Sequence, residues 1–171
     1  GVNVVVLEAE TIGWGASSRN GGMALTGLKI AMQTAIKRYG KSLAKQLFQC
    51  SLDSVSLVEE IVKEENIDCG FARYGHLLTA SKPAHYEGFK GEVDFMAKEF
   101  NHAVRLVPQN ELQNEIGSSA YYGGLVDEVS GGLNPAQYVT GLAGAAGKLN
   151  LVVYFHGWNN CIANTVEAAG G

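Results

Sequence analysis

The sequence predicts an α+β fold, because segments with the apolar spacing of a helix are interspersed with short runs that are typical of strands. Helices are expected at 41–65 and 83–101. Strands are expected at 71–80, 103–107 and 121–127, and they predict one mixed or antiparallel sheet on which both helices pack. The chain has 171 residues, of which 46% are hydrophobic, so it is large enough to bury a core beside such a sheet.

The run from Val2 to Leu7 is almost entirely β-branched, which is typical of a parallel strand that is buried on both faces. The run LVVYFH at 151–156 has the same character. Because neither run has another partner of its kind in the chain, 2–8 and 151–156 are expected to lie side by side as the remnant of a parallel sheet. A parallel strand needs neighbours, so we expect the chain to begin inside a larger fold.

The helix expected at 41–65 carries two adjacent apolar stripes with steps of three and four residues. One stripe consists of Leu43, Leu47, Cys50, Leu57 and Ile61, and the other of Ala44, Phe48, Val55, Val58 and Val62. Pro83 begins the second helix, whose apolar face consists of Tyr86, Phe89, Val93, Met96 and Phe100. Gly75 inside the strand segment suggests a bulge or a close approach of two backbones. A short helix is expected in PQNELQNEIG, residues 108–117.

The last helix has the clearest local signals. Asn134 is a good N-cap, and Pro135 occupies the first helical position. Leu133 and Tyr138 are spaced for a hydrophobic staple across this end. The helix also contains three glycines, Gly141, Gly144 and Gly147. Each weakens a helix by about 1 kcal/mol relative to alanine, so we expect close packing against a neighbour to be their reason.

Composition and spacing argue against several classes of function. The net charge of −4 gives no reason to expect nucleic-acid binding. No apolar run approaches a membrane span of about 18 residues, and no signal peptide is visible, so a cytoplasmic location is expected. The cysteines, Cys50, Cys69 and Cys161, lack the spacing of a zinc or disulfide framework and are expected to be buried and inert. We expect no metal site, because His85, His102 and His156 share no metal-ligand spacing. His76 is expected to be a structural histidine. The side chains of Tyr74, Tyr121 and Tyr122 are expected to pack in the core.

The stretch GWGASSRNGG at 13–22 has neither the alternation of a strand nor the apolar spacing of a helix. The dinucleotide fingerprint GxGxxG does not fit it, because the glycines of that motif directly follow a strand and open a helix. Glu8 at the end of the first strand instead indicates the second strand of such a unit, with its carboxylate on ribose hydroxyls. The loop would then lay backbone N–H groups and the hydroxyls of Ser17 and Ser18 along a pyrophosphate. An ordinary flexible loop is the alternative.

These residues also carry a resemblance to a known family. VVVLEAETIGWGASSRNGG resembles the second strand and following loop of the FAD-dependent amine and amino-acid oxidases of the D-amino-acid oxidase/glycine oxidase superfamily. Its GASSRNGG form is most similar to the gamma-glutamylputrescine oxidase-type members. The resemblance continues more weakly in two further stretches. IDCGFARYGHLLTA resembles the first substrate-domain strand, and GGLVDEVSGGLNPAQYVTGLAGAAGKLNLVVYFHG resembles the return into the cofactor domain. The resemblance implies a partial FAD-binding domain at 1–40, substrate-domain elements at 41–132, and a truncated return to the FAD-binding domain at 133–171.

The resemblance implies FAD as the cofactor and a small-molecule amine or amino acid as the substrate. The reaction is hydride transfer from the carbon bearing the amine to the flavin, followed by reoxidation by oxygen. Glu8 would bind the adenosine ribose, and the loop would follow the pyrophosphate, the ribityl chain and the isoalloxazine ring. The cofactor-binding residues implied are Glu8, Gly15, Ala16, Ser17, Ser18, Arg19, Asn20, Gly21 and Gly22. No catalytic residue is assigned.

The family's first strand with its GxGxxG turn has no counterpart in this sequence, so an internal fragment is expected. We therefore expect the isolated chain to bind FAD weakly or not at all and to be inactive. The alternative is a non-catalytic, truncated remnant or scaffold that self-associates and binds no flavin. Unpaired strand edges favour a homo-oligomer joined through Val2–Leu7 or Leu151–Phe155.

Overall fold

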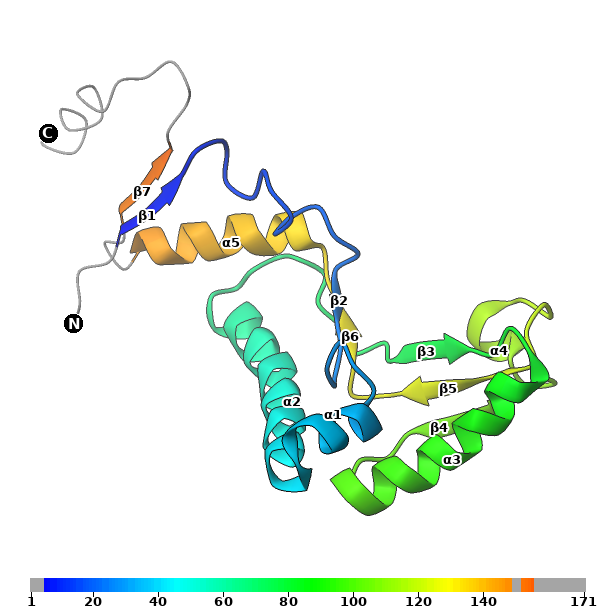
Figure 1. The fold of residues 1–171 in the computed structure, drawn as a ribbon. Helices are drawn as coiled ribbons and strands as arrows, with labels where there is room; N and C mark the ends of the chain where they lie inside the picture. The colour runs from blue at the N-terminus through cyan, green and yellow to red at the C-terminus, as the bar shows by residue number, and fades with distance from the viewer. Residues whose placement is uncertain (1–4, 149–151, 156–171) are drawn as a thin grey trace, which may run out of the picture. The chain divides into compact units, whose positions relative to one another are not determined.

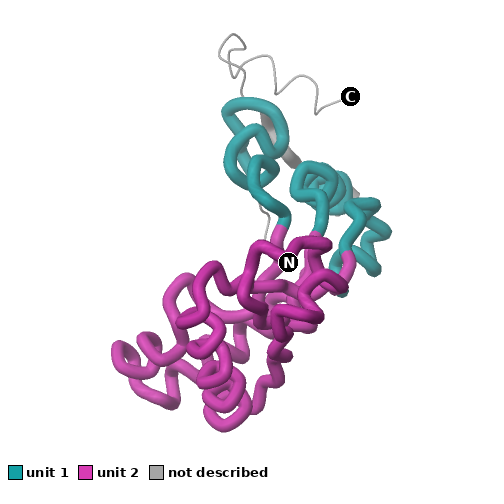
Figure 2. Tube along the Cα trace, turned by 90° about the vertical axis from the view of Figure 1, so that its right-hand side faces the viewer, with its two compact units in different colours: residues 1–22, 59–71, 133–171 teal, residues 23–58, 72–132 magenta. Residues whose placement is uncertain are grey.

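The computed structural model describes residues 5–148 and 152–155 of the chain. These residues belong to two compact units, which Figure 2 shows in different colours. The terminal unit comprises residues 1–22, 59–71 and 133–171, and the central unit comprises the two intervening segments. The assignment of sequence segments to an FAD-binding domain and a substrate domain stays a prediction.

The terminal unit contains a parallel pair of strands, β1 (Val5–Glu8) and β7 (Val152–Phe155), which pair along their whole length (Figure 1). The expectation that the two β-branched runs lie side by side in parallel is thus confirmed. Helix α5 (Pro135–Lys148) lies beside this pair. His156 and Cys161 lie outside the described residues.

The prediction that the first strand is buried on both faces is wrong. Val6 is 47% exposed and Leu7 is 76% exposed. Successive side chains of a strand point to opposite faces, and Val6 and Glu8 line a cavity together with α5. Leu7 therefore points to the other face of the pair. Its exposure shows that the described residues of the terminal unit leave that face uncovered.

Helix α5 begins as the sequence predicts. The side-chain Oδ1 of Asn134 accepts hydrogen bonds from the N–H groups of Ala136 and Gln137, at 3.1 and 3.2 Å. A Cβ at Gly141 would lie 2.3 Å from Ile67 Cγ2, so the expectation of close packing is confirmed there. The expectation of close packing is wrong for Gly144 and Gly147, because a Cβ at either position would meet open space.

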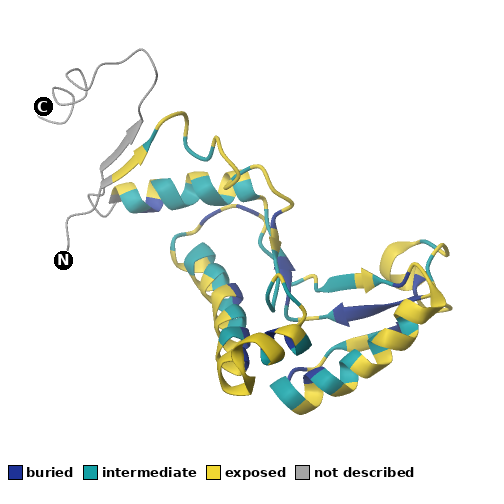
Figure 3. Cartoon of the chain, viewed as in Figure 1, coloured by how far each residue is buried: buried dark blue, intermediate teal, exposed yellow. Residues whose placement is uncertain are grey.

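The central unit is built on a three-stranded antiparallel sheet, which confirms the predicted sheet. Its strands are β3 (His76–Thr79), β5 (Gly123–Asp127) and β4 (Arg105–Pro108), with β5 in the middle. Gly123 to Val126 are buried in this central strand (Figure 3). A second, two-stranded antiparallel ribbon joins β2 (Met23–Ala24) to β6 (Gly131–Gly132).

The strand β3 is shorter than the predicted segment 71–80, and Gly75 is the reason. Its φ is +77°, and a Cβ there would lie 3.2 Å from the carbonyl oxygen of Asp127. The close approach of two backbones that the sequence suggested is therefore confirmed. Before this glycine, Ala72 forms a single isolated bridge with Gly132.

The bounds of the two long helices agree with the prediction, but the expectation that both pack on the sheet is confirmed for the second helix alone, because the buried side chains of the first belong to a cluster of helices. Helix α2 spans Lys41–Glu64 and crosses a boundary between the units, and α3 spans Pro83–Phe100 and packs on the sheet (Figure 1). The short helix α4 covers Gln113–Ile116. Helix α1 (Met32–Tyr39) was not predicted, although Met32, Ala35, Ile36 and Tyr39 have helical spacing.

Two apolar clusters stabilise the central unit. The first gathers buried side chains of α1, α2 and α3, namely Met32, Ala35, Ala44, Phe48 and Met96. The second lies on the sheet and consists of Val107, Leu112 and Val126, with Leu77 and Tyr121 against it. The buried residues of α2 therefore belong to a core shared with helices, while α3 carries the helical packing on the sheet.

Only one of the two apolar stripes of α2 is buried. Ala44, Phe48 and Val55 are buried, whereas Leu43 and Leu57 are 45% and 54% exposed. Cys50 lies on the exposed stripe, so the prediction that it is buried is wrong, and the prediction holds for Cys69. The expectation of core packing is also wrong for Tyr74, which is 82% exposed, and for Tyr122, which is 42% exposed.

Candidate functional site

The glycine-rich loop is held together by its own hydrogen bonds. The Asn20 side-chain amide donates to the carbonyl oxygens of Ala16 and Ser17, at 2.9 and 3.1 Å. Its Oδ1 accepts from the N–H of Gly22 at 2.8 Å. The backbone N–H of Arg19 donates to the same Ala16 oxygen at 3.3 Å. The side chain of Asn20 is exposed, and these contacts bond it to its own loop, where it fixes the course of the backbone.

Two glycines are required by contacts within the terminal unit. Gly22 is buried with φ +65°, and a Cβ there would lie 1.9 Å from the carbonyl oxygen of Leu133. Gly13 has φ +72°, and a Cβ there would contact both Ser18 Cβ and Val139 Cγ1 at 3.1 Å. The hydroxyl of Ser18 donates to the carbonyl oxygen of Gly13. Packing within the protein itself therefore explains why a glycine occupies position 22.

Other predicted site residues of the loop face solvent. Gly15, Ala16, Ser17, Arg19 and Gly21 are exposed. A Cβ at Gly15 would meet nothing within 4 Å. The Arg19 guanidinium carbon lies over the indole of Trp14, 4.6 Å from the ring centroid. The loop therefore presents backbone, a hydroxyl and a cation on its outer side.

Glu8 and part of the loop line one cavity of about 310 Å³ in the terminal unit. Glu8, Gly15 and Ser17 contribute polar groups to its lining, and α5 contributes an apolar wall of Val139, Leu142, Ala143 and Ala146. One carboxylate oxygen of Glu8 accepts the N–H of Glu10 at 3.1 Å. In the part of the chain that the structure describes, the other oxygen has no hydrogen-bond partner within the protein. The structure thus brings an acceptor carboxylate and a hydroxyl to the same cavity.

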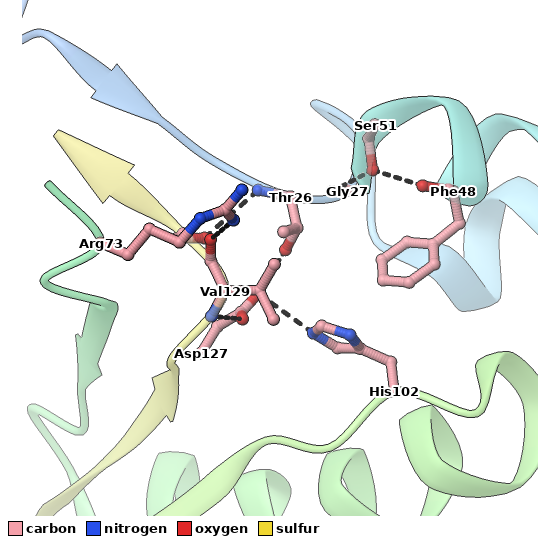
Figure 4. A network of polar contacts seen from close by, with 9 residues as sticks. Thr26, Gly27, Phe48, Ser51, Arg73, His102, Asp127 and Val129 are labelled. Atoms are coloured by element: carbon pink, nitrogen blue, oxygen red, sulfur yellow. Dashed lines mark hydrogen bonds and ion pairs between the residues drawn. The ribbon is translucent and has the colours of Figure 1, made fainter. Parts of the chain in front are cut away.

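The central unit holds a polar network around Asp127, at the end of β5 (Figure 4). One oxygen of Asp127 accepts the N–H of Val129 at 3.0 Å, and the other accepts the hydroxyl of Thr26. His102 Nε2 lies 3.2 Å from that second oxygen without hydrogen-bond geometry, so their attraction is electrostatic. Arg73 donates to the Val129 carbonyl oxygen at 2.6 Å.

The environment of Asp127 favours its charged form. Burial alone would raise the pKa of this carboxyl group, because it penalises the charge. The neighbouring His102, the Thr26 hydroxyl and the Val129 N–H outweigh burial and lower the pKa to about 2. Sequence reasoning missed this group, because Thr26 and Asp127 are separated by 101 positions along the chain. No spacing rule connects residues that only folding brings together.

Asp127 and His102 also line a cavity of about 630 Å³ in the central unit. Its walls are mainly apolar, and the other titratable side chains that face it are His76, His85 and Glu92. Among the described residues, no group of three or more histidine, cysteine, aspartate or glutamate side chains is arranged to hold a metal ion. The role of His76 as a structural histidine stays a prediction.

Comparison with known proteins identifies the class to which this chain belongs. Residues 1–165 match the family described as FAD dependent oxidoreductase. The chain therefore belongs to this family, and FAD is the cofactor that the family implies. The resemblance noted in the sequence is thus confirmed. No helix in the described part of the chain is long and apolar enough to cross a membrane.

Particular relatives agree with this class. Probable oxidoreductase OrdL of Haemophilus influenzae is 30% identical over 155 residues, which are 90% of this chain and 36% of that protein. Gamma-glutamylputrescine oxidoreductase of Escherichia coli is 30% identical over 145 residues, which are 85% of this chain and 34% of that protein. The chain thus spans about a third of the length of the curated relatives it matches.

Solved structures share the fold. Glycine oxidase from Geobacillus kaustophilus matches with a TM-score of 0.67 at 19% identity, over 90% of this chain and 40% of that one. L-amino acid deaminase from Proteus vulgaris matches with a TM-score of 0.67 at 17% identity, over 91% of this chain and 34% of that one. The predicted α+β architecture is therefore confirmed as part of an oxidase fold.

Proposed function

We propose that this chain contributes a strand and a glycine-rich loop to the cofactor site of an enzyme that oxidises the C–N bond of an amine or amino acid. The observation that carries the proposal is that Glu8, Gly15 and Ser17 line the same cavity. Membership of the FAD-dependent oxidoreductase family and similarity to gamma-glutamylputrescine oxidoreductase support the same reaction class. The electron acceptor in this proposal is oxygen.

The residues of the cavity fit one part of FAD. The free carboxylate oxygen of Glu8 accepts hydrogen bonds from ribose hydroxyls, as an acid at the end of a second strand does in dinucleotide sites. The Ser17 hydroxyl and the open backbone at Gly15 suit a phosphate, since nothing lies within 4 Å of the Cβ position there. Arg19 is the neighbouring cation. A volume of about 310 Å³ matches a portion of the cofactor rather than the whole.

When it is bound, the flavin supplies the hydride acceptor for the reaction. The chain's own residues bind and orient the nucleotide end, because Glu8 ends a paired strand and the loop is held by its own hydrogen bonds. Asn20 holds that loop from within, and Gly22 lets it pass Leu133. The assignment of Ser18, Asn20, Gly21 and Gly22 to flavin contacts stays part of the proposal.

We also propose that the chain by itself binds FAD weakly and does not oxidise an amine. The hydroxyl of Ser18 and the amide of Asn20 already bond to carbonyl oxygens of the loop, so they have fewer donors left for a ligand. The remaining donors act at an exposed site, where water competes for the same hydrogen bonds. Self-association through the exposed Leu7 side of β1 belongs to the same proposal.

A titration of the purified chain with FAD, followed by calorimetry and by flavin absorbance, tests the cofactor site. We expect saturable binding that is weaker than micromolar. Glu8→Gln is expected to weaken it about tenfold, because a hydrogen bond to a charged group is lost. Glu10→Gln is the matched control, since its side chain is exposed on the same segment and does not line the cavity.

Three results would contradict parts of the proposal. If wild type and Glu8→Gln bind FAD equally, the cofactor site is wrong and the non-catalytic alternative is favoured. Micromolar or tighter binding contradicts the weak-binding proposal. Measurable peroxide release with gamma-glutamylputrescine or simple amino acids contradicts the proposed inactivity of the chain alone.

A further inference from the structure

Trp14 is the one large side chain in a loop that otherwise consists of small and polar residues, and it is 50% exposed. Its indole contacts Arg19, whose guanidinium carbon lies 4.6 Å from the ring centroid. This distance is within the range of a cation–π interaction. The contact therefore gives the exposed indole a partner on the same loop.

Hydrogen bonds of the loop backbone hold both residues in place. The N–H of Trp14 donates to the carbonyl oxygen of Thr11 at 2.9 Å, and the N–H of Arg19 donates to that of Ala16 at 3.3 Å. Between them, the Ser18 hydroxyl donates to the Gly13 carbonyl oxygen and closes the turn. The separation of the two side chains is thus set by the turn.

Arg19 has an aromatic partner and, among the described residues, no acidic one. In the described part of the chain, no carboxylate forms an ion pair with its guanidinium, although the protein contains 17 acidic residues. Arg19 rests on an aromatic face instead. A cation held in this way keeps its full charge for an anion that approaches the loop.

From this geometry we propose that Trp14 is a positioning residue, which holds the Arg19 guanidinium so that it engages a phosphate group of the cofactor. The inference rests on the proposed cofactor site. It adds a residue that lies outside the cavity lined by Glu8, Gly15 and Ser17. Trp14 itself touches no part of the ligand in this arrangement.

The chemistry of the guanidinium explains why an aromatic partner suits this role. A guanidinium carries its five N–H donors in one plane, and it binds phosphate through pairs of them. An indole offers no hydrogen-bond acceptor oxygen or nitrogen to those donors, whereas a carboxylate partner would occupy two of them. An indole therefore restricts the cation without competing for the bonds that a phosphate needs.

The test uses the 171-residue chain and ADP, which carries the ribose and pyrophosphate of the cofactor. Binding is followed by nuclear magnetic resonance, through the amide signals of the loop and the side-chain N–H signals of Arg19. In the free wild type we expect the Arg19 signals to be displaced by the indole ring current. Trp14→Leu removes the displacement, and Trp14→Phe retains part of it.

On titration with ADP, Trp14→Leu is expected to weaken binding about two- to fivefold, which corresponds to an exposed cation–π interaction. Trp14→Phe is expected to stay within about twofold of wild type, because phenylalanine also offers an aromatic face. In an Arg19→Gln background, Trp14→Leu should cause no further loss, since the residue acts through Arg19. The thermal midpoint of Trp14→Leu is measured as a check on folding and is expected to equal that of wild type.

The outcomes separate this proposal from the proposed function. Equal ADP affinity of wild type and Trp14→Leu, with weaker binding by Glu8→Gln, overturns the positioning role and leaves the cofactor site standing. A further loss from Trp14→Leu in the Arg19→Gln background also overturns it. If no variant differs from wild type, the cofactor site itself is wrong, and the positioning role falls with it.

Discussion

Replacing Asp127 by asparagine is expected to lower the free energy of unfolding of the central unit at neutral pH. The carboxylate is 15% exposed, and its partners are His102, the Thr26 hydroxyl and the Val129 N–H. Asparagine retains the shape of the side chain and loses its charge. The variant therefore removes the charge together with one of the two acceptor oxygens of the network.

The magnitude follows from the pKa of Asp127, which the folded protein lowers from 3.8 to about 2. A shift of one unit corresponds to about 1.4 kcal/mol, so the charged form stabilises the fold by about 2 kcal/mol. Because the folded pKa lies below the unfolded one, this stabilisation is fully present above the ordinary pKa of 3.8. It is lost as the pH falls towards about 2.

Urea unfolding followed by circular dichroism between pH 2 and pH 7 measures this effect. The difference between wild type and Asp127→Asn should be about 2 kcal/mol at pH 7 and should shrink towards zero near pH 2. Asp94→Asn is the matched control, because Asp94 is an exposed aspartate of α3. Parallel curves for wild type and Asp127→Asn would refute the reasoning.

Three further predictions concern packing. Gly22→Ala places a methyl group 1.9 Å from a backbone oxygen at φ +65°, so its thermal midpoint should fall, whereas that of Gly15→Ala should not. Gly141→Ala should destabilise the chain, while Gly144→Ala, in open space, should stabilise it by about 1 kcal/mol; equal effects in urea unfolding would contradict the proposed packing. Leu7→Lys should shift sedimentation towards the monomer, because Leu7 is 76% exposed on a strand whose outer edge has no partner among the described residues. A monomeric wild type would exclude this association.

The sequence alone was sufficient for features that depend on near neighbours. The helices at 41–65 and 83–101 follow from apolar periodicity, and α5 begins at Asn134 because its side chain satisfies N–H groups two and three residues away. The resemblance to the family was noted on one local stretch, the first strand and the glycine-rich loop, and the match over residues 1–165 confirms it. Each of these conclusions rests on interactions that are encoded within a few residues.

The sequence alone could not decide which of two equivalent apolar stripes is buried. Both stripes of α2 have helical spacing, and only the position of Met32 and Met96 decides that Phe48 is buried while Leu57 is exposed. The sequence likewise predicts that Leu7 is a buried strand residue. Its burial would require a second layer of structure on the face of the β1–β7 pair to which it points. Periodicity shows that a face is apolar, whereas burial depends on what covers it.

The sequence by itself determined the long helices, the three-stranded sheet, the parallel pair of terminal strands and the family. The tertiary structure alone decided that Asp127 meets Thr26 and His102, and that Gly22 is needed where the chain passes Leu133. The physical reason is the range of the interactions. Periodicity and capping act over one or two turns, whereas a buried charge finds its partners only when distant segments fold against each other.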